Sequence, residues 1–491
     1  MRDALLLGLA GNPTLPADLF ARLAAAGDED VLYALAAREQ LTTAQARTLP
    51  AAGDPALTSQ LVRSGRVPWS EIPESHPRRA VDAVVGGVAP LALWWDAATD
   101  PDAEVRQEVA HELDAPTEVV AALAHDPDPR VVATAAGHPH LPQELLPGLA
   151  RHPSTVVREA VADNENAPAP VLAALLADGG HPAPTRCGAC HRREAACLDH
   201  AAGVRRVRLA AAAHPAVPTA GLAAFLDAPE VWTVTAFAAR TDLPDGYLER
   251  LAEHPAADVR AVVAANPAVP EPLLRTLATD PAADVRRAVA ENPAVPLDLL
   301  ITVARHERLP DEPAPRVASA TETELHALVT SRVAQVRALV ADRAELPAAL
   351  VEQLVTDPDP GVARRIAAHP ALTPEQLAEL VERHGPPVFS AAVHHPGCPA
   401  ALLHHIAASP AAGRRVLRDT ARHPAAPPEA LLLCLAAESA DVREYAATHP
   451  ALPVAVLESL IDGPDEALAR AAAENPSLPE RLMERITREC L

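Results

Sequence analysis

The sequence predicts an all-α protein built as a solenoid of about 18–19 helix-pair repeats, each about 26 residues long. Two observations support this prediction. The run Asn-Pro-Ala-Val-Pro at Asn266 to Pro270 returns 26 residues later at Asn292 to Pro296. Apolar residues on both sides of this Asn-Pro motif recur with helical spacing. Because each repeat is too thin to bury a core alone, neighbouring repeats must stack.

Each repeat contains two stretches with the apolar pattern of a short helix. Val259, Val262 and Val263 stand at positions i, i+3 and i+4 before the motif, and a second apolar stripe runs from Leu273 to Leu277 after it. Each stripe is narrow and suits a helix that packs on one side only. The sequence therefore predicts two helices per repeat.

Proline and its neighbours mark where these helices begin and end. Asn292 precedes a proline, which disfavours helical geometry in the residue before it, so the first helix is expected to end there. Pro296 is expected to start the second helix. Asp280 followed by Pro281 is expected to supply an N-cap acceptor for the next repeat.

Composition excludes several broad classes. The 491 residues carry a formal net charge of −23, which argues against general affinity for nucleic acid or for anionic membranes. The 52 prolines recur at fixed offsets, so they punctuate helices rather than indicate disorder. The apolar run Leu5 to Ala10 continues into the motif at Asn12, which makes it a repeat helix rather than a secretion signal. A cytoplasmic protein without a membrane span is expected.

The spacing of the motif divides the chain into five predicted parts. They are residues 1–100 (divergent N-terminal repeats and a cap), 101–180 (repeats), 181–208 (a Cys/His metal-site insertion that replaces one repeat), 209–475 (repeats) and 476–491 (a C-terminal capping helix). Trp69, Trp94 and Trp95 lie in the first part. They belong either to the cap, which we favour because terminal repeats usually shield a stack, or to a pocket for a partner.

The repeat motif resembles a known family. The pattern V-R-x-x-V-A-x-N-P-x-[LV]-P-x-x-L-L, as in the run from Val285, is similar to the leucine-rich repeat variant family, and its Asp-x-Val-Arg part has HEAT-like character. The resemblance covers nearly the whole chain. It implies a right-handed superhelix of alternating α and 3₁₀ helices and, in some members, an iron–sulfur module ahead of the repeats. The period here leaves room for two α-helices, and the cysteine cluster is internal.

The strongest chemical signal lies between Arg186 and His200. Cys187 and Cys190 have the spacing that lets two thiolates bind one ion, and Cys197 with His200 repeats that spacing as a mixed pair. Four ligands of this S₃N type suit tetrahedral zinc. The sequence therefore predicts a structural zinc site in this remodelled repeat.

Several alternatives to this zinc site remain open. His191 or His181 could replace the fourth ligand. A [4Fe-4S] cluster is the rival that the resemblance favours, but such a cluster normally takes four thiolates and only three are near. Cys398 and Cys434 are too many repeats away to complete it. A third alternative is that the cluster holds no metal.

Arginines crowd the same region, at Arg186, Arg192, Arg193, Arg205, Arg206 and Arg208. We favour the view that they offset the charge of the thiolates and of neighbouring acids. The alternative is a basic patch that binds nucleic acid or an acidic protein.

The remaining cysteines, histidines and arginines follow the repeat. Cys398 and Cys434 occupy apolar places and are expected in the core. The histidines immediately before the motif are expected to be helix-end residues rather than ligands; they are His138, His214, His369, His395, His423 and His449. The recurring arginines are expected to form an Asp/Arg ladder between adjacent repeats, or alternatively a row lining a groove for an anionic partner; they are Arg106, Arg158, Arg208, Arg260, Arg286, Arg337 and Arg443.

The sequence shows no phosphate loop, nucleophile elbow or dinucleotide fingerprint that stands free of the repeat. The predicted function is therefore a non-enzymatic scaffold that binds a protein partner through its solenoid surface, with one structural zinc site. The first alternative is an iron–sulfur redox or sensor protein. The second is a nucleic-acid binder that uses Arg186 to Arg208.

Overall fold

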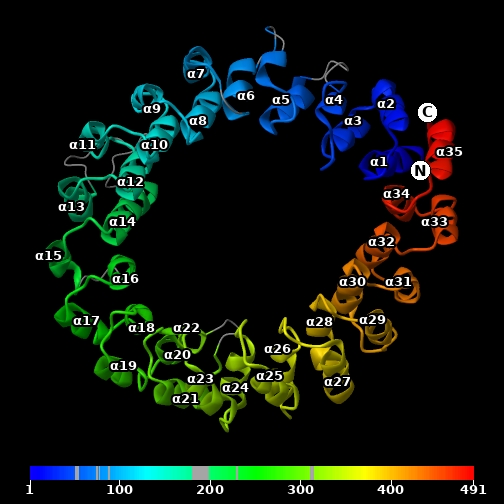
Figure 1. Cartoon of the computed structure of the whole chain (residues 1–491). Helices are drawn as coiled ribbons and strands as arrows, with labels where there is room; N and C mark the ends of the chain where they lie inside the picture. Colours follow the sequence, from blue (N-terminus) through cyan, green and yellow to red (C-terminus); the bar gives the residue numbers. More distant parts are fainter. Residues whose placement is uncertain are drawn as a thin grey trace. The chain divides into compact units, whose positions relative to one another are not determined.

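The computed structural model describes residues 1–49, 55–72, 74, 76, 78–86, 89–179, 198–227, 231–309 and 314–491. Within these ranges every regular element is a helix (Figure 1). The helices follow one another in eighteen pairs, each made of a first helix, here called the A helix, and a second, the B helix. The predicted all-α helix-pair solenoid is thus confirmed.

The chain folds into two compact units. Unit 1 consists of Met1–Glu71 together with Val317–Leu491, and unit 2 consists of Ile72–Arg316. In each unit successive A helices pack side by side, as α18 packs on α20 in unit 2 and α30 on α32 in unit 1. Each B helix packs against the A helix that follows it.

The A helices of unit 2 are α6 (Arg79–Val85), α8 (Ala103–His111), α10 (Pro129–Gly137), α12 (Thr155–Asp163), α14 (Leu198–Ala213), α16 (Val231–Ala238), α18 (Ala257–Ala265) and α20 (Ala283–Glu291). Its B elements are α7 (Leu91–Ala98), α9 (Thr117–Leu123), η3 (Gln143–Leu145) with α11 (Leu146–Leu149), α13 (Ala169–Asp178), α15 (Thr219–Leu222) with η5 (Ala223–Phe225), α17 (Asp245–Ala252), α19 (Glu271–Leu277) and α21 (Leu297–His306). α14 crosses the predicted boundary between residues 208 and 209.

The A helices of unit 1 are α1 (Arg2–Gly11), α3 (Glu29–Ala36), α5 (Pro55–Arg63), α24 (Ala334–Ala341), α26 (Pro360–Ile366), α28 (Pro386–His394), α30 (Arg414–Arg422), α32 (Ala440–Thr448) and α34 (Glu466–Glu474); α22 (Pro315–Ala318) spans the unit boundary. Its B elements are α2 (Ala17–Ala26), α4 (Thr43–Ala46), η2 (Trp69–Glu71), α23 (Glu322–Val329), α25 (Ala348–Val355), α27 (Pro374–His384), α29 (Ala400–Ala407), α31 (Pro428–Leu435), α33 (Val454–Ile461) and α35 (Glu480–Cys490).

The repeat formed by α18 and α19 shows how the sequence produces this fold. Val259 and Val263 on α18 and Leu274 on α19 are buried, as the helical spacing predicts. α18 ends at Asn266, whose backbone is extended, and α19 begins immediately after Pro270. Most B elements are α-helices of this kind, and 3₁₀ turns occupy the B position at η2, η3 and η5.

The expected N-cap at Asp280 is wrong. α20 begins at Ala283, and its N-cap is Ala282, which makes no side-chain capping bond. The Asp280 carboxylate instead accepts the backbone N–H of Ala282 at 2.8 Å and pairs with Arg260 of the preceding A helix at 2.7 Å. The guanidinium takes the oxygens that would otherwise cap the helix.

The residue before the motif ties each repeat to the one before it. Asn292 Nδ2 donates to the carbonyl oxygens of Ala264 and Asn266 at 2.8 Å, and its Oδ1 accepts the N–H of Ala294 at 2.8 Å. Histidine reproduces this pattern: His369 Nδ1 accepts the N–H of Ala371, and its Nε2 faces the carbonyl oxygen of Arg343 at 2.9 Å. The acceptor role of Nδ1 places the ring proton on Nε2.

These contacts form a ladder of hydrogen bonds along the stack, here called the motif ladder. Further contacts run from His138 to Glu112, Asn164 to His138, His214 to Asn164, Asn266 to Arg240, His395 to His369, His423 to His395, His449 to His423 and Asn475 to His449. The prediction that these histidines are helix-end residues is confirmed. Their bonds to the previous repeat were not predicted.

The recurring arginines form the predicted ladder. Arg260 donates to the carbonyl oxygens of His254 and Pro255 in the loop before its helix, and its guanidinium pairs with Asp280 in the loop after the repeat. Equivalent pairs join Arg106 to Asp126 at 2.6 Å, Arg286 to Glu307 at 2.6 Å and Arg337 to Asp357 at 2.6 Å.

Burial decides between the ladder and the alternative groove. The Arg260 side chain is 14% exposed and that of Asp280 is 7% exposed. This guanidinium therefore has its charge satisfied inside the protein. Its hydrogen bond holds the pKa of the Asp280 carboxyl below its usual range.

Candidate functional site

The predicted metal ligands lie mostly outside the described residues. Cys187, Cys190 and Cys197 fall in the range 180–197, as do the alternative ligands His181 and His191. His200 lies in the first turn of α14, and its side chain is also outside the description. The zinc site, its iron–sulfur rival and the metal-free alternative therefore stay predictions. Among the residues that are described, no cluster of three or more His, Cys, Asp or Glu side chains could hold a metal ion.

The isolated cysteines lie in the core, as predicted. Cys398 is 2% exposed and Cys434 is fully buried. Burial raises the pKa of the Cys398 thiol to about 12 and that of Cys434 to about 11. Both thiols therefore stay protonated at neutral pH, which makes them poor nucleophiles and poor metal ligands.

Two arginines of the predicted basic cluster are engaged within the protein. Arg206 pairs with Glu159 at 2.9 Å. Arg208 donates to the carbonyl oxygen of Leu176 at 3.0 Å and lies over the ring of Phe225. These contacts are the kind expected if the arginines serve the repeat fold. Arg205 is exposed, and the other three lie outside the described residues.

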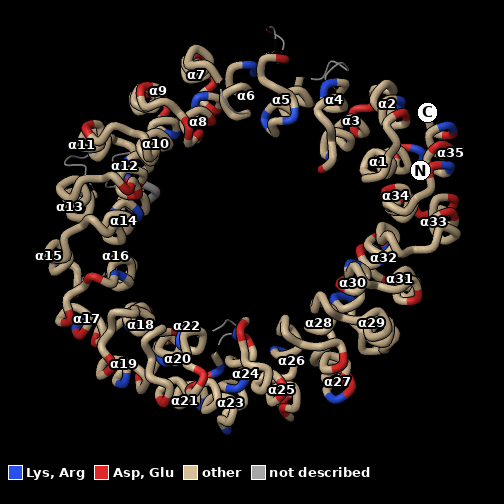
Figure 2. Tube along the Cα trace, in the orientation of Figure 1, with Lys and Arg blue, Asp and Glu red and all other residues tan. Residues whose placement is uncertain are grey.

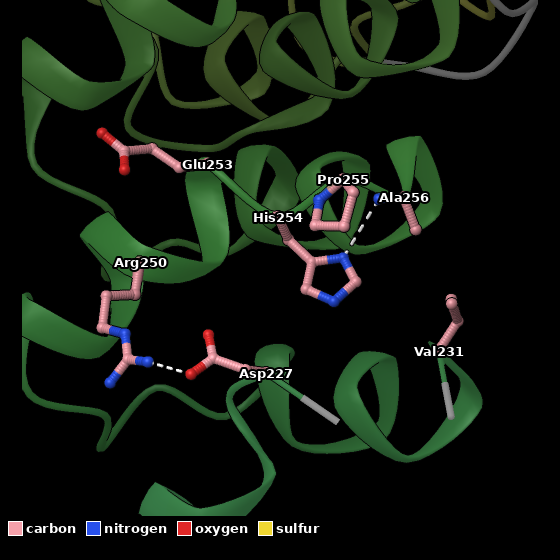
Figure 3. A pocket seen from close by; sticks show the side chains of 7 residues that line it. All are labelled: Asp227, Val231, Arg250, Glu253, His254, Pro255 and Ala256. Atoms are coloured by element: carbon pink, nitrogen blue, oxygen red, sulfur yellow. Dashed lines mark hydrogen bonds and ion pairs between the residues drawn. The ribbon is translucent and has the colours of Figure 1, made fainter. Parts of the chain in front are cut away.

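A cavity of about 610 Å³ opens beside His254 in unit 2 (Figure 3). Arg250 on α17 and Asp227 form an ion pair on one side of it. The His254 ring extends from the loop after α17 toward the space between Asp227 and Val231 (Figure 3). Its Nδ1 accepts the N–H of Ala256 at 3.1 Å, so its Nε2 carries the proton and offers it to the cavity.

The cavity marks a place where the arginine ladder changes. His254 stands where other repeats have a carboxylate, because the preceding A helix has Val234 at the place of Arg260, 26 residues away. His152 follows Val132 in the same way. The residues lining the cavity include no hydroxyl or thiol nucleophile, and its guanidinium is already paired. The cavity can contact a ligand, but it has no group arranged for catalysis.

A second feature is the exposed basic face of α30 in unit 1, here called the α30 face (Figure 2). Its arginines are Arg414, Arg415, Arg418 and Arg422. The side chains of Arg414 and Arg415 are 69% and 74% exposed, and that of Arg418 is 36% exposed. Their spacing of one, three and four residues brings them onto neighbouring positions of the helix surface.

One buried carboxylate lies beneath this face. Asp419 is 8% exposed, and Arg418 approaches its Oδ1 at 3.3 Å. Its Oδ2 lies 3.8 Å from Arg415 and 3.4 Å from His394 on the neighbouring α28, and accepts no hydrogen bond from any described residue. A single carboxylate among these cations leaves an excess of positive charge on the face.

The neighbouring helix α32 adds an aromatic side chain and one counter-charge. Tyr445 is 39% exposed, and the guanidinium of Arg422 lies 5.1 Å from the centre of its ring. Asp441 on the same helix pairs with Arg414 at 2.9 Å. Arg415, Arg418 and Arg422 therefore remain as the exposed cations beside an exposed ring.

Sequence reasoning missed the α30 face, although a signal was present. Four arginines at helical spacing between Arg414 and Arg422 stand out in a chain of net charge −23. They were overlooked because only one arginine position per repeat follows the period. In the equivalent places of the other repeats the residue type varies.

Of the predicted tryptophans, Trp94 is buried in α7 and Trp95 on the same helix is 36% exposed. Trp69 belongs to η2 of unit 1. Nothing in these contacts distinguishes a cap from a partner site. In the described part of the chain, no helix combines the length and apolar character needed to cross a membrane.

Comparison with known proteins adds no identification. No protein-family model and no curated protein matches this chain. Among solved structures, the crystal complex of SYS-1/POP-1 contains a similar chain, with 11% sequence identity over 92% of this chain and 91% of that chain and a TM-score of 0.14. A TM-score this low carries no argument about fold or function.

Proposed function

We propose that this protein is a non-enzymatic repeat scaffold that binds an acidic segment of a protein partner at the α30 face. The observation that supports the proposal is the set of exposed guanidiniums of Arg415, Arg418 and Arg422 beside Tyr445, on a chain that is otherwise strongly acidic. Carboxylates accept hydrogen bonds from guanidinium groups with good geometry. An exposed tyrosine adds contact area at low entropic cost.

The total charge of the chain does not prevent such binding. At an ionic strength of about 0.15 M the Debye length is about 8 Å, so a carboxylate at the α30 face interacts mainly with nearby arginines. The same screening makes the contact sensitive to salt. The family resemblance, which we also propose as the ancestry of the repeat, agrees with a binding role.

The test uses a fluorescent peptide made only of glutamate as the probe. We expect its anisotropy to rise with the protein at low salt, and the affinity to fall as salt increases. Replacing Arg415 and Arg418 together with serine should weaken binding by about tenfold or more, because each lost charge-assisted contact contributes about 0.5–1 kcal/mol at an exposed site.

The matched control removes the same charge elsewhere. Arg305 on α21 and Arg488 on α35 are exposed arginines of B helices. Their double serine variant should bind the peptide as the unchanged protein does. Equal losses in both variants would show a general charge effect and would contradict the proposed site.

The zinc site is the second part of the proposal. We propose that Cys187, Cys190, Cys197 and His200 hold one Zn²⁺ that stabilises the remodelled repeat, with a [4Fe-4S] cluster as the alternative. Elemental analysis of protein purified with and without air should find one zinc per chain. Iron with sulfide and absorption near about 400 nm would favour the cluster, and the absence of both metals would refute this part.

The nucleic-acid alternative is less favoured, since Arg206 and Arg208 are engaged by Glu159 and Leu176. It predicts binding to single- or double-stranded DNA with a steep salt dependence. Replacement of Arg192 and Arg193 with serine should abolish such binding if it occurs.

A further inference from the structure

The first repeat of the chain lies against the last repeat within unit 1. α1 packs on α34 and α35, and α2 also contacts α35 (Figure 1). The Met1 ammonium pairs with Glu466 at the start of α34. Arg2 donates to the carbonyl oxygens of Cys490 and Leu491, the latter at 3.2 Å. The predicted N-terminal and C-terminal caps are therefore in contact with each other.

This contact uses the register of consecutive repeats. Asn12 Nδ2 donates to the carbonyl oxygen of Ala473 at 2.9 Å and to that of Asn475 at 2.8 Å. Asn475 makes the same pair of bonds to Ala447 and His449 in the preceding repeat. The motif ladder thus passes from the last repeat to the first without a change of geometry.

Glycines on α1 provide the fit to α34. A Cβ atom at Gly8 would lie 2.2 Å from the carbonyl oxygen of Arg470 and 2.8 Å from the Cβ of Ala473. A Cβ at Gly11 would lie 3.3 Å from the Glu474 side chain. The backbone of α1 therefore approaches α34 more closely than any side chain at position 8 would allow.

The contact can open without unfolding a repeat. No peptide bond joins α35 to α1, and each repeat of a solenoid contacts mainly its neighbours. Opening would expose two complementary edges, α1 with Asn12 on one and α34 with α35 on the other. Such edges make a heterologous, head-to-tail contact that the same segments of another chain satisfy equally well.

We propose that the edge formed by α34 and α35 is a docking site for the N-terminal repeat of a second copy of this chain. The occupant is the segment α1 with α2, since its Asn12 amide and Gly8 match this edge within one chain. Binding in trans replaces the chain's own N-terminal repeat, which competes from a high effective concentration.

The test uses two full-length variants with complementary defects. Gly8→Val blocks α1 but leaves the α34 edge intact, and Ala473→Leu blocks the α34 edge but leaves α1 intact. Neither variant can close or pair with itself, so each should sediment as a monomer. An equimolar mixture at about 100 µM should show an about twofold rise in mass, as α1 of one variant docks on α34 of the other.

Controls separate docking from misfolding. Gly246→Val changes a helical glycine of unit 2 whose Cβ would meet nothing within 4 Å, and its mixture with Ala473→Leu should stay monomeric. Circular dichroism should show unchanged helix content in every variant, and Gly8→Ala replaces Gly8→Val if the valine variant does not fold. A mixture of two folded variants that remains monomeric would overturn the proposal.

Discussion

At the residue scale, asparagine and histidine are interchangeable in the motif ladder because their polar atoms have matching places. The Asn292 amide nitrogen and His369 Nε2 both face the carbonyl oxygen of the preceding motif residue. Asn292 Oδ1 and His369 Nδ1 both accept the N–H two residues ahead. The difference is that histidine can take up a proton on the nitrogen that must remain an acceptor.

This difference predicts a pH dependence of stability. Burial lowers the pKa of His138, His369 and His449. As pH falls through about 6.5, the unfolded chain binds protons that these folded histidines do not, so stability decreases from there down to the folded pKa values. We expect the midpoint temperature to fall between about pH 7.5 and pH 5.5.

The matched variant replaces these three histidines with asparagine. It keeps the ladder bonds but has no titrating nitrogen, so the midpoint temperature at neutral pH should change little and its dependence on pH should flatten. Thermal unfolding followed by circular dichroism measures both. An unchanged slope in the triple variant would show that other groups control the acid response.

The sequence predicted the place of these residues but not their bonds. Asn266 and Asn292 precede prolines, so local rules place them at helix ends. Their acceptors, such as Ala238 and Ala264, lie 28 residues earlier. That pairing depends on how the repeats stack, which no local rule contains.

At the element scale, the arginine ladder holds the loops between repeats. Arg260 binds the loop before α18 through the His254 and Pro255 carbonyl oxygens and the loop after α19 through Asp280. The sequence predicted an Asp/Arg ladder because Asp258 and Arg260 are too close along one helix to pair. It could not identify Asp280 as the partner, since proline after it also suggested an N-cap.

Replacing Arg260 with methionine should therefore destabilise unit 2 locally. The Asp280 carboxylate, 7% exposed, would lose its partner, and two loop carbonyl oxygens would lose their donor. A loss of about 2 kcal/mol is expected. Hydrogen exchange should show faster exchange in α18 and α20 than elsewhere in the described part of unit 2.

Arg275 provides the comparison for this variant. It forms ion pairs with Glu271 and Asp298, but its side chain is 45% exposed, so solvent replaces its contacts. Arg275→Met should leave exchange rates unchanged. Similar destabilisation by both variants would mean that burial does not govern the strength of these pairs.

At the scale of the whole molecule, the order of repeats in unit 1 differs from the order of the sequence. The motif ladder runs from Arg343 through Asn475 and then continues at Asn12 and Arg38. The sequence predicted caps at both ends, because terminal repeats usually face solvent. Contact between segments more than 460 residues apart has no local signature, although the complete motif at Asn12 and the small Gly8 were signals that α1 has a neighbour.

This order predicts that unit 1 folds as one stack when its two segments are joined in reverse. A fusion of residues 317–491, a short Gly-Ser linker and residues 1–71 should fold, because Arg2 already contacts Leu491 and stability in a repeat stack depends on neighbouring repeats. Hydrogen exchange should protect α1 and α3 in this fusion as in the full chain. The same fusion with Gly8→Val should retain protection in α30 and α32 but lose it in α1, since the added side chain would meet the Arg470 carbonyl oxygen and break the ladder at Asn12. Rapid exchange of α1 in the unsubstituted fusion would show instead that the contact requires unit 2.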